Sequence, residues 1–275
     1  STHSVWLKRT DIEGDNRSTI ISGANTDTNN YMKLRFGDND RLQLYGVHSG
    51  SNNCSITTTA EFRDVSGWYH FVMQIDTTNA TASERVKFYI NNELQALSST
   101  TYPSAGDPNY LTISDDLEIG RNAVDDNEHF DGTMSHFHGI DGTIYAPTAF
   151  GEYDANGVWK IKTDVSVTYG TNGFFILKDG NSVTDQSGNS NNFTVGGGTL
   201  TKTEDSPSNV FATWNPLEYA NNNFSYANGN TYSSISYAGY NYVTSTLGAS
   251  SGKYYCEMKA NTTDGSSKWV FGIAT

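Results

Sequence analysis

Two carboxylates in the segment Glu152-Tyr153-Asp154 have a spacing that glycosidic bond hydrolysis could use. Residues two apart in a strand share a face, so Glu152 and Asp154 would project side by side. One would attack the sugar while the other protonates the leaving oxygen. The segment is rich in turn residues, however, and the next alternate position is Asn156 rather than a third carboxylate. We therefore expect a solvated turn here and no catalytic residue. No GxSxG, HExxH or phosphate-loop motif is present.

His136 and His138 form a second pair of residues that could take part in chemistry, as metal ligands. If they lie in one strand they share a face, and two imidazoles can bind a transition metal. His129 and Asp131 are close in sequence, but a trimer axis would be needed to complete the ligand shell. The alternative is a pair of ordinary polar strand positions, which we favour. We therefore predict no metal site from this pair.

Asp179, Asn181 and Asp185 could offer oxygen ligands to calcium from a loop. Their segment, DGNSVTDQSG, lacks the spacing of a 12-residue calcium-binding loop. The alternative is a solvated turn. We predict that the protein needs no cofactor and leave calcium as the open alternative.

The stretch from Tyr219 to Tyr242 carries many aromatic rings among Asn, Ser and Gly. Flat rings stack on sugar faces while neighbouring amides bind hydroxyl groups, and the same residue types recognise proteins. The alternative is a strand surface buried between two sandwiches. The predicted ligand-binding residues are Tyr232, Tyr237, Tyr240 and Tyr242.

Composition limits the partners. The chain of 275 residues has 17 Lys plus Arg against 30 Asp plus Glu, a net charge of −13 that would repel nucleic acid. Neutral glycans or a protein surface fit better. No apolar run is long enough for a membrane span. Cys54 and Cys256 lie far apart without metal-type spacing, so we interpret both as isolated thiols.

The element that must organise these residues is a central hairpin from Trp68 to Asn92. Its first arm places Tyr69, Phe71, Met73 and Ile75 on one side, and its second arm does the same with Val86, Phe88 and Ile90. A period of two is typical of half-buried strands, whereas these residues would scatter around a helix. The connector is polar and too long for a two-residue turn.

Similar patterns predict further short strands separated by turn residues, with a polar run from Ser49 to Thr59 before the central hairpin. The loop from Ser98 to Asn109 contains two prolines and is excluded from a central strand. One helical turn is expected near 146–152. The fold class is therefore all-β, a two-sheet antiparallel jelly-roll sandwich. The other expected strands are 5–7, 18–22, 31–36, 42–44, 94–97, 117–120 and 130–140.

The composition shifts to Asn, Gly, Thr and Ser beyond residue 189. We predict a jelly-roll domain at 1–195, a linker at 196–217 and a partial second β unit at 218–275. The expected strands of this incomplete second sandwich are Ser251–Lys259 and Lys268–Ala274.

Several motifs carry a family resemblance. WYHFVMQID, RVKFYINNEL and HFDGTMSHFHGIDG resemble the laminin G/pentraxin-like branch of the concanavalin A-like jelly rolls. The later motifs FGEYDANGVWK, YGTNGFFI, DQSGNSNNFTV and DSPSNVFATWNPL are similar to structural proteins of marine tailed phages, and the resemblance covers residues 1–217. GKYYCEMK and WVFGIAT resemble the opening strands of a SPRY domain, with Cys256 where Trp is usual.

The resemblance implies a noncatalytic module on the virion surface, as a tail fibre or capsid appendage that attaches to host-surface glycans. One alternative is a purely structural virion protein that mediates assembly contacts with other virion proteins. Another is a glycan-degrading enzyme, for which the residues give no positive support. Proteins of this kind are expected to be homo-oligomers. Fold alone does not choose among these functions, because they depend on loops and surfaces.

Overall fold

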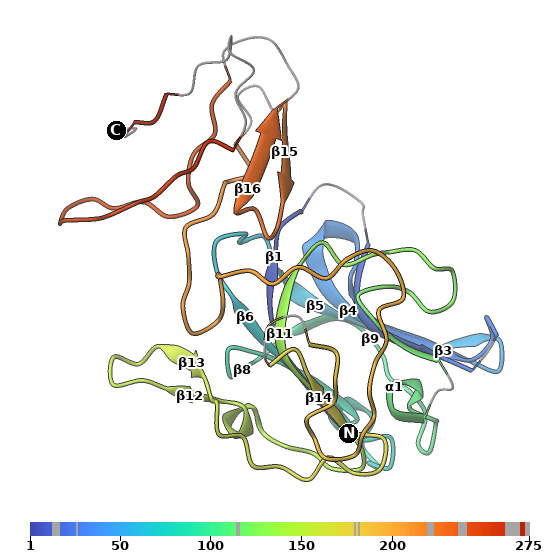
Figure 1. The fold of residues 1–275 in the computed structure, drawn as a ribbon. Coiled ribbons are helices and arrows are strands. Elements are labelled where there is room, and N and C mark those ends of the chain that lie inside the picture. Colours follow the sequence, from blue (N-terminus) through green and yellow to red (C-terminus); the bar gives the residue numbers. More distant parts are fainter. Residues whose placement is uncertain are drawn as a thin grey trace.

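Alternating side chains build the first of two six-stranded antiparallel sheets (Figure 1). In the central hairpin, β6 (Tyr69–Ile75) pairs with β7 (Val86–Ile90), and both Phe71 and Phe88 are buried. This confirms the predicted hairpin and its inward face. The sheet order is β14-β11-β1-β6-β7-β8, with β1 at Thr2–Arg9, β8 at Glu93–Leu94, β11 at Gly132–Ile140 and β14 at Phe174–Ile176.

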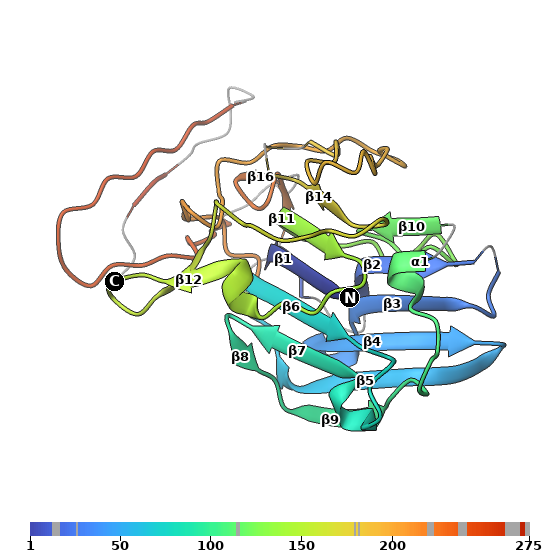
Figure 2. The same cartoon turned by 90° about the horizontal axis from the view of Figure 1, so that it is seen from below.

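The second sheet lies against the first, and Figure 2 shows the two layers from below. Its strand order is β10-β2-β3-β4-β5-β9. The bounds are β2 Ser18–Ala24, β3 Tyr31–Phe36, β4 Arg41–His48, β5 Ser51–Glu61, β9 Leu97–Thr101 and β10 Asp116–Ile119.

The core fills the space between the sheets. Buried side chains from β1, β6, β7 and β11 meet those of β2 to β5 in one hydrophobic cluster. Three aromatic rings, Phe36, Phe62 and Phe71, contact one another with centroids 5.6–6.2 Å apart. The predicted all-β sandwich is confirmed, because alternation on each strand supplies one apolar face to this shared interior.

The polar run at 49–59 was not predicted as a strand, yet most of it forms β5, which has 11 residues. Cys54 and Ile56 are buried at alternate positions, while their neighbours are hydroxyl and amide side chains. Only one face of this strand meets the core, and two of the three buried residues on that face are Cys54 and Thr58. The alternation of apolar and polar residues is therefore weak in the sequence. β9 then adds to β5 as the edge of the sheet, just before Pro103.

Short elements complete the described fold. The computed structural model describes residues 1–12, 17–25, 27–113, 116–178, 180, 182–218, 223–235, 241–261 and 270–272. The helical turn expected at 146–152 is a 3₁₀ turn, Pro147–Ala149, after which β12 (Gly151–Tyr153) pairs with β13 (Trp159–Ile161). The remaining turns are η1 Asp38–Asp40, η2 Ala82–Glu84 and α1 Tyr110–Ile113. No helix in the described residues is long and apolar enough to cross a membrane.

The outer face of the first sheet is covered by the chain between 141 and 175. His70 on β6 is held between two tryptophans, with its ring centroid 4.7 Å from that of Trp6 and 5.9 Å from that of Trp159. Trp159 Nε1 donates to His70 Nδ1 at 3.0 Å, and His70 Nε2 lies 2.9 Å from Ser4 Oγ. Because Nδ1 accepts a hydrogen bond, the proton sits on Nε2 and is donated to Ser4. Burial lowers the pKa of His70 to about 3.

Beyond the sandwich, the chain returns to the outer face of β1. Lys8 Nζ bonds Asp205 Oδ2 at 2.8 Å, with 1% and 2% of the two side chains exposed. Trp68 Nε1 and the backbone N–H of Phe211 both donate to Asp205 Oδ1, and Asn230 Nδ2 donates to the carbonyl of Thr10. The segment predicted as a linker is therefore attached to the sandwich by a buried ion pair. The domain boundaries themselves stay a prediction.

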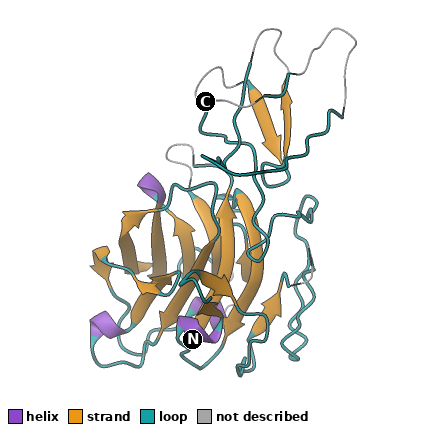
Figure 3. Ribbon diagram, turned by 90° about the vertical axis from the view of Figure 1, so that its left-hand side faces the viewer, coloured by secondary structure: helices purple, strands orange, loops and turns teal. Residues whose placement is uncertain are grey.

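A hairpin of β15 (Phe224–Ala227) and β16 (Tyr232–Ile235) follows, and it stands above one end of the sandwich (Figure 3). The strand expected at Ser251–Lys259 is absent, because these described residues have no assigned strand. Within the part of the chain that the structure describes, no strand pairs with this segment to satisfy its backbone groups. The strand expected at 268–274 falls mostly outside the described residues.

Candidate functional site

The outer side of the second sheet carries a hydrogen-bonded set of polar and aromatic side chains. Core residues alternate with Tyr31, Lys33 and Arg35 on β3, with Gln43 and Tyr45 on β4, and with Ser55 and Thr57 on β5. We call Tyr31, Gln43, Tyr45 and Thr57 the tyrosine face. The rings of Tyr31 and Tyr45 have centroids 6.1 Å apart, and both side chains are partly exposed.

Two buried cations hold the tyrosine face in place. Arg35 donates through Nε and Nη2 to Gln43 Oε1, at 3.0 and 2.9 Å, and through Nη1 to Glu128 Oε1 at 2.6 Å. Lys33 Nζ bonds the other Glu128 oxygen at 3.0 Å. Lys33 lies over the Tyr31 ring and Arg35 over the Tyr45 ring, at 5.8 and 5.6 Å from their centroids. Polar and aromatic groups are therefore preorganised together.

Burial and the one carboxylate that both cations contact, Glu128, determine the pKa shifts of this face. Burial lowers the pKa of Lys33, and the neighbouring Arg35 lowers it further. Burial alone would raise the pKa of Glu128, but the hydrogen bond from Lys33 and the charge of Arg35 lower it overall. Burial and the adjacent Tyr45 phenol raise the pKa of Tyr31 to about 12. At neutral pH this face presents neutral phenols beside two cations, Lys33 and Arg35, that share the Glu128 carboxylate.

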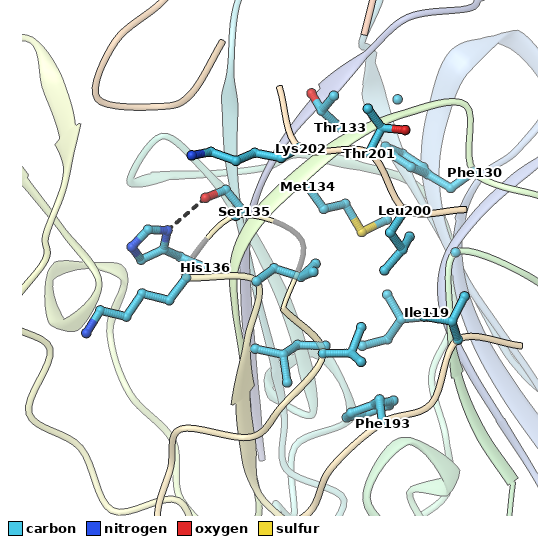
Figure 4. Close-up of a pocket in the computed structure, with 18 of the residues that line it drawn as sticks. Ile119, Phe130, Thr133, Met134, Ser135, His136, Phe193, Leu200, Thr201 and Lys202 are labelled. Atoms are coloured by element: carbon cyan, nitrogen blue, oxygen red, sulfur yellow. Dashed lines mark hydrogen bonds between the residues drawn. The ribbon is translucent and has the colours of Figure 1, made fainter. Parts of the chain in front are cut away.

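A second feature is a groove of about 2160 Å³ along the edge of the sandwich (Figure 4). It lies between β10, the first half of β11 and the segment 191–209. β14 pairs only with Phe137–Gly139, so residues 132–136 of β11 extend beyond that partner strand. A bulge at this point gives His136 a positive φ of 48°. Its Nδ1 lies 2.8 Å from Ser135 Oγ at the groove wall.

The four predicted ligand-binding tyrosines are only partly described. Tyr232 begins β16 with 39% of its surface exposed, and Tyr242 is 57% exposed. Tyr237 and Tyr240 lie outside the described residues. The structure therefore leaves their joint role a prediction, although the two described rings are accessible on the C-terminal segment.

Glu152 and Asp154 occupy the hairpin of β12 and β13. Asp154 Oδ1 accepts the backbone N–H groups of Asn156 and Val158, both at 2.9 Å, which lower its pKa. Its carboxylate therefore shapes the turn between the strands. Neither carboxylate lines the groove. Asp154 therefore lies in the expected turn, whereas Glu152 lies on the exposed strand β12.

His136 and His138 both contact the ring of Phe175, with centroids 5.9 and 3.9 Å away. His138 Nδ1 lies 2.9 Å from the Tyr169 hydroxyl, and burial lowers the pKa of His138 well below its ordinary value. In the described part of the chain, no three His, Cys, Asp or Glu residues are placed to hold a metal ion.

Of the calcium candidates, only Asp185 is described. Its Oδ1 accepts the N–H groups of Phe175 and Ser187, and its Oδ2 accepts the Ser187 hydroxyl and the Asn191 N–H, all at 2.7–2.9 Å. Burial alone would raise the pKa of Asp185, but these hydrogen bonds lower it overall. Its carboxylate folds the loop onto β14, so its lone pairs already have partners.

Sequence reasoning did not select the tyrosine face. The alternation of Tyr31, Lys33 and Arg35 against apolar neighbours was visible and correctly predicted a strand. The missing information was that Glu128, more than 90 residues later, would reach both cations. A weak available signal was two adjacent strands that each carry Tyr and long polar side chains on the outer face.

Comparisons with known proteins give one family match. A family described as the concanavalin A-like lectin/glucanases superfamily matches residues 1–146. No curated protein matches the chain.

Solved structures with partial similarity include three proteins. A Bacteroides ovatus protein is 22% identical, with a TM-score of 0.33 over 50% of this chain and 36% of that one. The CBM40 of a Ruminococcus gnavus sialidase is 13% identical, with a TM-score of 0.35 over 50% and 74%. A pentraxin from Limulus polyphemus is 17% identical, with a TM-score of 0.31 over 50% and 61%. The chain thus spans about a third of the Bacteroides protein.

Proposed function

Because this chain belongs to the concanavalin A-like lectin/glucanase superfamily, we propose that it is a noncatalytic carbohydrate-binding module whose ligand lies on the tyrosine face. The observation that supports this most directly is the pair of partly exposed rings, Tyr31 and Tyr45, beside the fixed Arg35–Gln43 network. An aromatic ring provides a flat apolar surface for a sugar, and nearby amides and hydroxyls bind its hydroxyl groups.

The tyrosine face is also held in place before a ligand binds, so binding should cost little conformational entropy. Gln43 Oε1 is held by Arg35, and Gln43 Nε2 donates to Thr57 Oγ1 at 3.2 Å. Side chains that are already fixed lose little conformational entropy when a ligand binds. Lys33 and Arg35 are already bonded to Glu128 and Gln43, so neither is free to pair with a charged group, and a neutral sugar suits this face better than a strongly charged one.

The test is binding of the full chain to an immobilised glycan array. Tyr45→Ala should weaken binding to the best glycan by about tenfold or more, which corresponds to about 1.4 kcal/mol. Gln43→Ala should weaken it for a different reason, loss of hydrogen bonds. Unchanged binding by both variants would exclude the tyrosine face as the ligand site.

The tyrosines of the C-terminal segment form a second proposed surface for the same function. Paired variants separate the two: Tyr232→Ala with Tyr242→Ala, and Tyr237→Ala with Tyr240→Ala. If the ligand lies on the tyrosine face, these variants keep wild-type array binding. Loss of binding only in these variants would move the site to the C-terminal segment.

We propose no catalytic activity and no required cofactor. Incubation with a polysaccharide that binds on the array should release no reducing ends. Release that disappears in Glu152→Gln would establish the enzymatic alternative. Array binding should also be unchanged in EDTA, and its loss would show that calcium takes part.

The setting we propose is the surface of a phage particle, as a tail fibre or capsid appendage that attaches to host glycans as a homo-oligomer. A map of the intact particle would test this by showing which face meets its neighbours. A purely structural role in assembly is the second candidate. It is favoured by strongly exposed apolar side chains in the described C-terminal segment, including Tyr254, Tyr255 and Val270, which suit contact with another virion protein.

A further inference from the structure

We propose that the groove beside β11 binds a second type of ligand, an extended amphipathic anion with an alkyl chain and a carboxylate or phosphate head. The groove is separate from the tyrosine face, because none of Tyr31, Gln43, Tyr45 and Thr57 lines it. The proposal therefore goes beyond carbohydrate binding and does not depend on it.

The floor of the groove is the uncovered edge of the hydrophobic core. Six apolar side chains pack against the core but remain partly exposed, and all six line the groove. They are Leu117, Ile119, Phe130, Met134, Leu177 and Phe193. Across from them, Leu200 projects from the segment 191–209 towards Met134 and Ile119 (Figure 4). Burying such a surface under an alkyl chain is favourable, because it removes apolar area from water.

The groove is lined by several carboxylates, of which Glu118 and Asp126 are paired with Arg121, and by a second set of polar groups around Lys202. Figure 4 shows Lys202, Ser135 and His136 together, away from Ile119 and Phe193. Lys178 also lines the groove. Neither Lys178 nor Lys202 has an ion pair among the described residues, although the chain carries a net charge of −13 and most of its other cations are paired. Two unpaired ammonium groups beside an imidazole and a hydroxyl suit an anionic head.

Shape and lining distinguish this ligand from a sugar. The groove runs along β10 and the first half of β11 beside the segment 191–209, so an extended chain follows its length better than a compact ligand does. Much of the floor is aliphatic, with Ile119, Met134, Leu177 and Leu200 around it. The rings in the floor, Phe130 and Phe193, pack against the core, and the aliphatic side chains beside them offer methylene contacts to an alkyl chain.

The experiment is calorimetric titration of the full chain with three probes of equal chain length: dodecanoate, dodecyl phosphate and dodecanol. Dodecanoate or dodecyl phosphate should bind at least about tenfold more tightly than dodecanol, because only a charged head can pair with the lysines. Whichever anion binds more tightly identifies the source of the head group. Equal binding of all three probes, or no binding of any, would overturn the proposal.

Substitutions in the groove distinguish the contacts of the charged head group from those of the alkyl chain. Lys178→Glu combined with Lys202→Glu should lower the affinity for the anions by about tenfold or more and leave that for dodecanol unchanged. Lys253→Glu combined with Lys259→Glu is the matched control, because these described lysines are outside the groove and should change nothing. Leu200→Ser should weaken all three probes. Leu200 is 40% exposed, so this variant should still fold. If the two lysine pairs behaved alike, the head-group assignment would be wrong.

Discussion

Replacing Asp205 with Ala should have the largest effect on stability of any single change outside the hydrophobic core. The substitution leaves Lys8 Nζ, in a side chain only 1% exposed, without the carboxylate 2.8 Å away. It also removes the acceptor for Trp68 Nε1 and for the backbone N–H of Phe211. Removing one partner of a buried ion pair costs about 3–5 kcal/mol, because the remaining charge is uncompensated.

The cost should appear first as detachment of the C-terminal segment. The Asp205–Lys8 pair joins this segment to β1 together with the hydrogen bond from Asn230 to Thr10, and the sandwich core does not depend on either contact. We expect Asp205→Ala to make this segment sensitive to protease under native conditions, and to lower the free energy of unfolding by about 3 kcal/mol if the two parts unfold together. Urea titration followed by tryptophan fluorescence, with limited proteolysis, measures both effects.

Two further variants test whether the buried ion pair anchors the C-terminal segment. Glu61→Ala removes the carboxylate from a surface pair with Arg41, in which 34% and 37% of the side chains are exposed, and should cost less than about 1 kcal/mol. Lys8→Met with Asp205→Leu replaces the ion pair by apolar groups and should recover the part of the loss that comes from the uncompensated charge, while Trp68 Nε1 and the Phe211 N–H stay without their acceptor. An Asp205→Ala protein as stable and protease-resistant as the Glu61→Ala protein would refute the anchoring role of the buried pair.

Three other predictions concern stability, each measured by urea titration. Both ring nitrogens of buried His3 lack a partner in the described structure, and burial lowers its pKa to about 3. The unfolded chain therefore binds more protons than the folded protein below about pH 6.5, which destabilises the folded protein as the pH falls. His3→Leu should raise the free energy of unfolding at every pH, and by about 2 kcal/mol more at pH 5 than at pH 8. A gain in the free energy of unfolding that is the same at both pH values would contradict this. Gly139→Ala places Cβ 2.3 Å from Phe174 Cε1 and should cost about 1–3 kcal/mol, whereas Gly197→Ala meets no atom within 4 Å and should be neutral. Glu128→Gln leaves Lys33 and Arg35 without their shared anion and should cost about 2 kcal/mol, so an unchanged urea midpoint would argue against the network.

The sandwich was predictable because its strands alternate strongly. Phe71 and Phe88 are buried as their period of two requires, and both strands of their hairpin lie inside the first sheet, with neighbours on each side. Alternation is a local signal, so one sequence is enough to read it. β5 escaped prediction because Cys54 and Ile56 are the only apolar residues on its inner face, beside a run of polar ones.

Sites that depend on distant partners were not predictable. Lys8 and Asp205 are separated by 197 positions, and neither residue type suggests burial. Glu128 likewise reaches Lys33 and Arg35 from a loop 95 and 93 positions away. The sequence identified tyrosines as candidate sugar contacts, but selected those crowded together in the chain. The fold instead places Tyr31 and Tyr45 together on adjacent strands.

Heteronuclear NMR of the full chain, titrated with the glycan that binds best on the array, tests the central claim most directly. Binding to the tyrosine face should shift the backbone signals of Tyr31, Gln43, Tyr45 and Thr57 and leave those of β15 and β16 unchanged. Saturable shifts confined to β15, β16 or the groove, with the signals of β3 to β5 unmoved, would contradict the account.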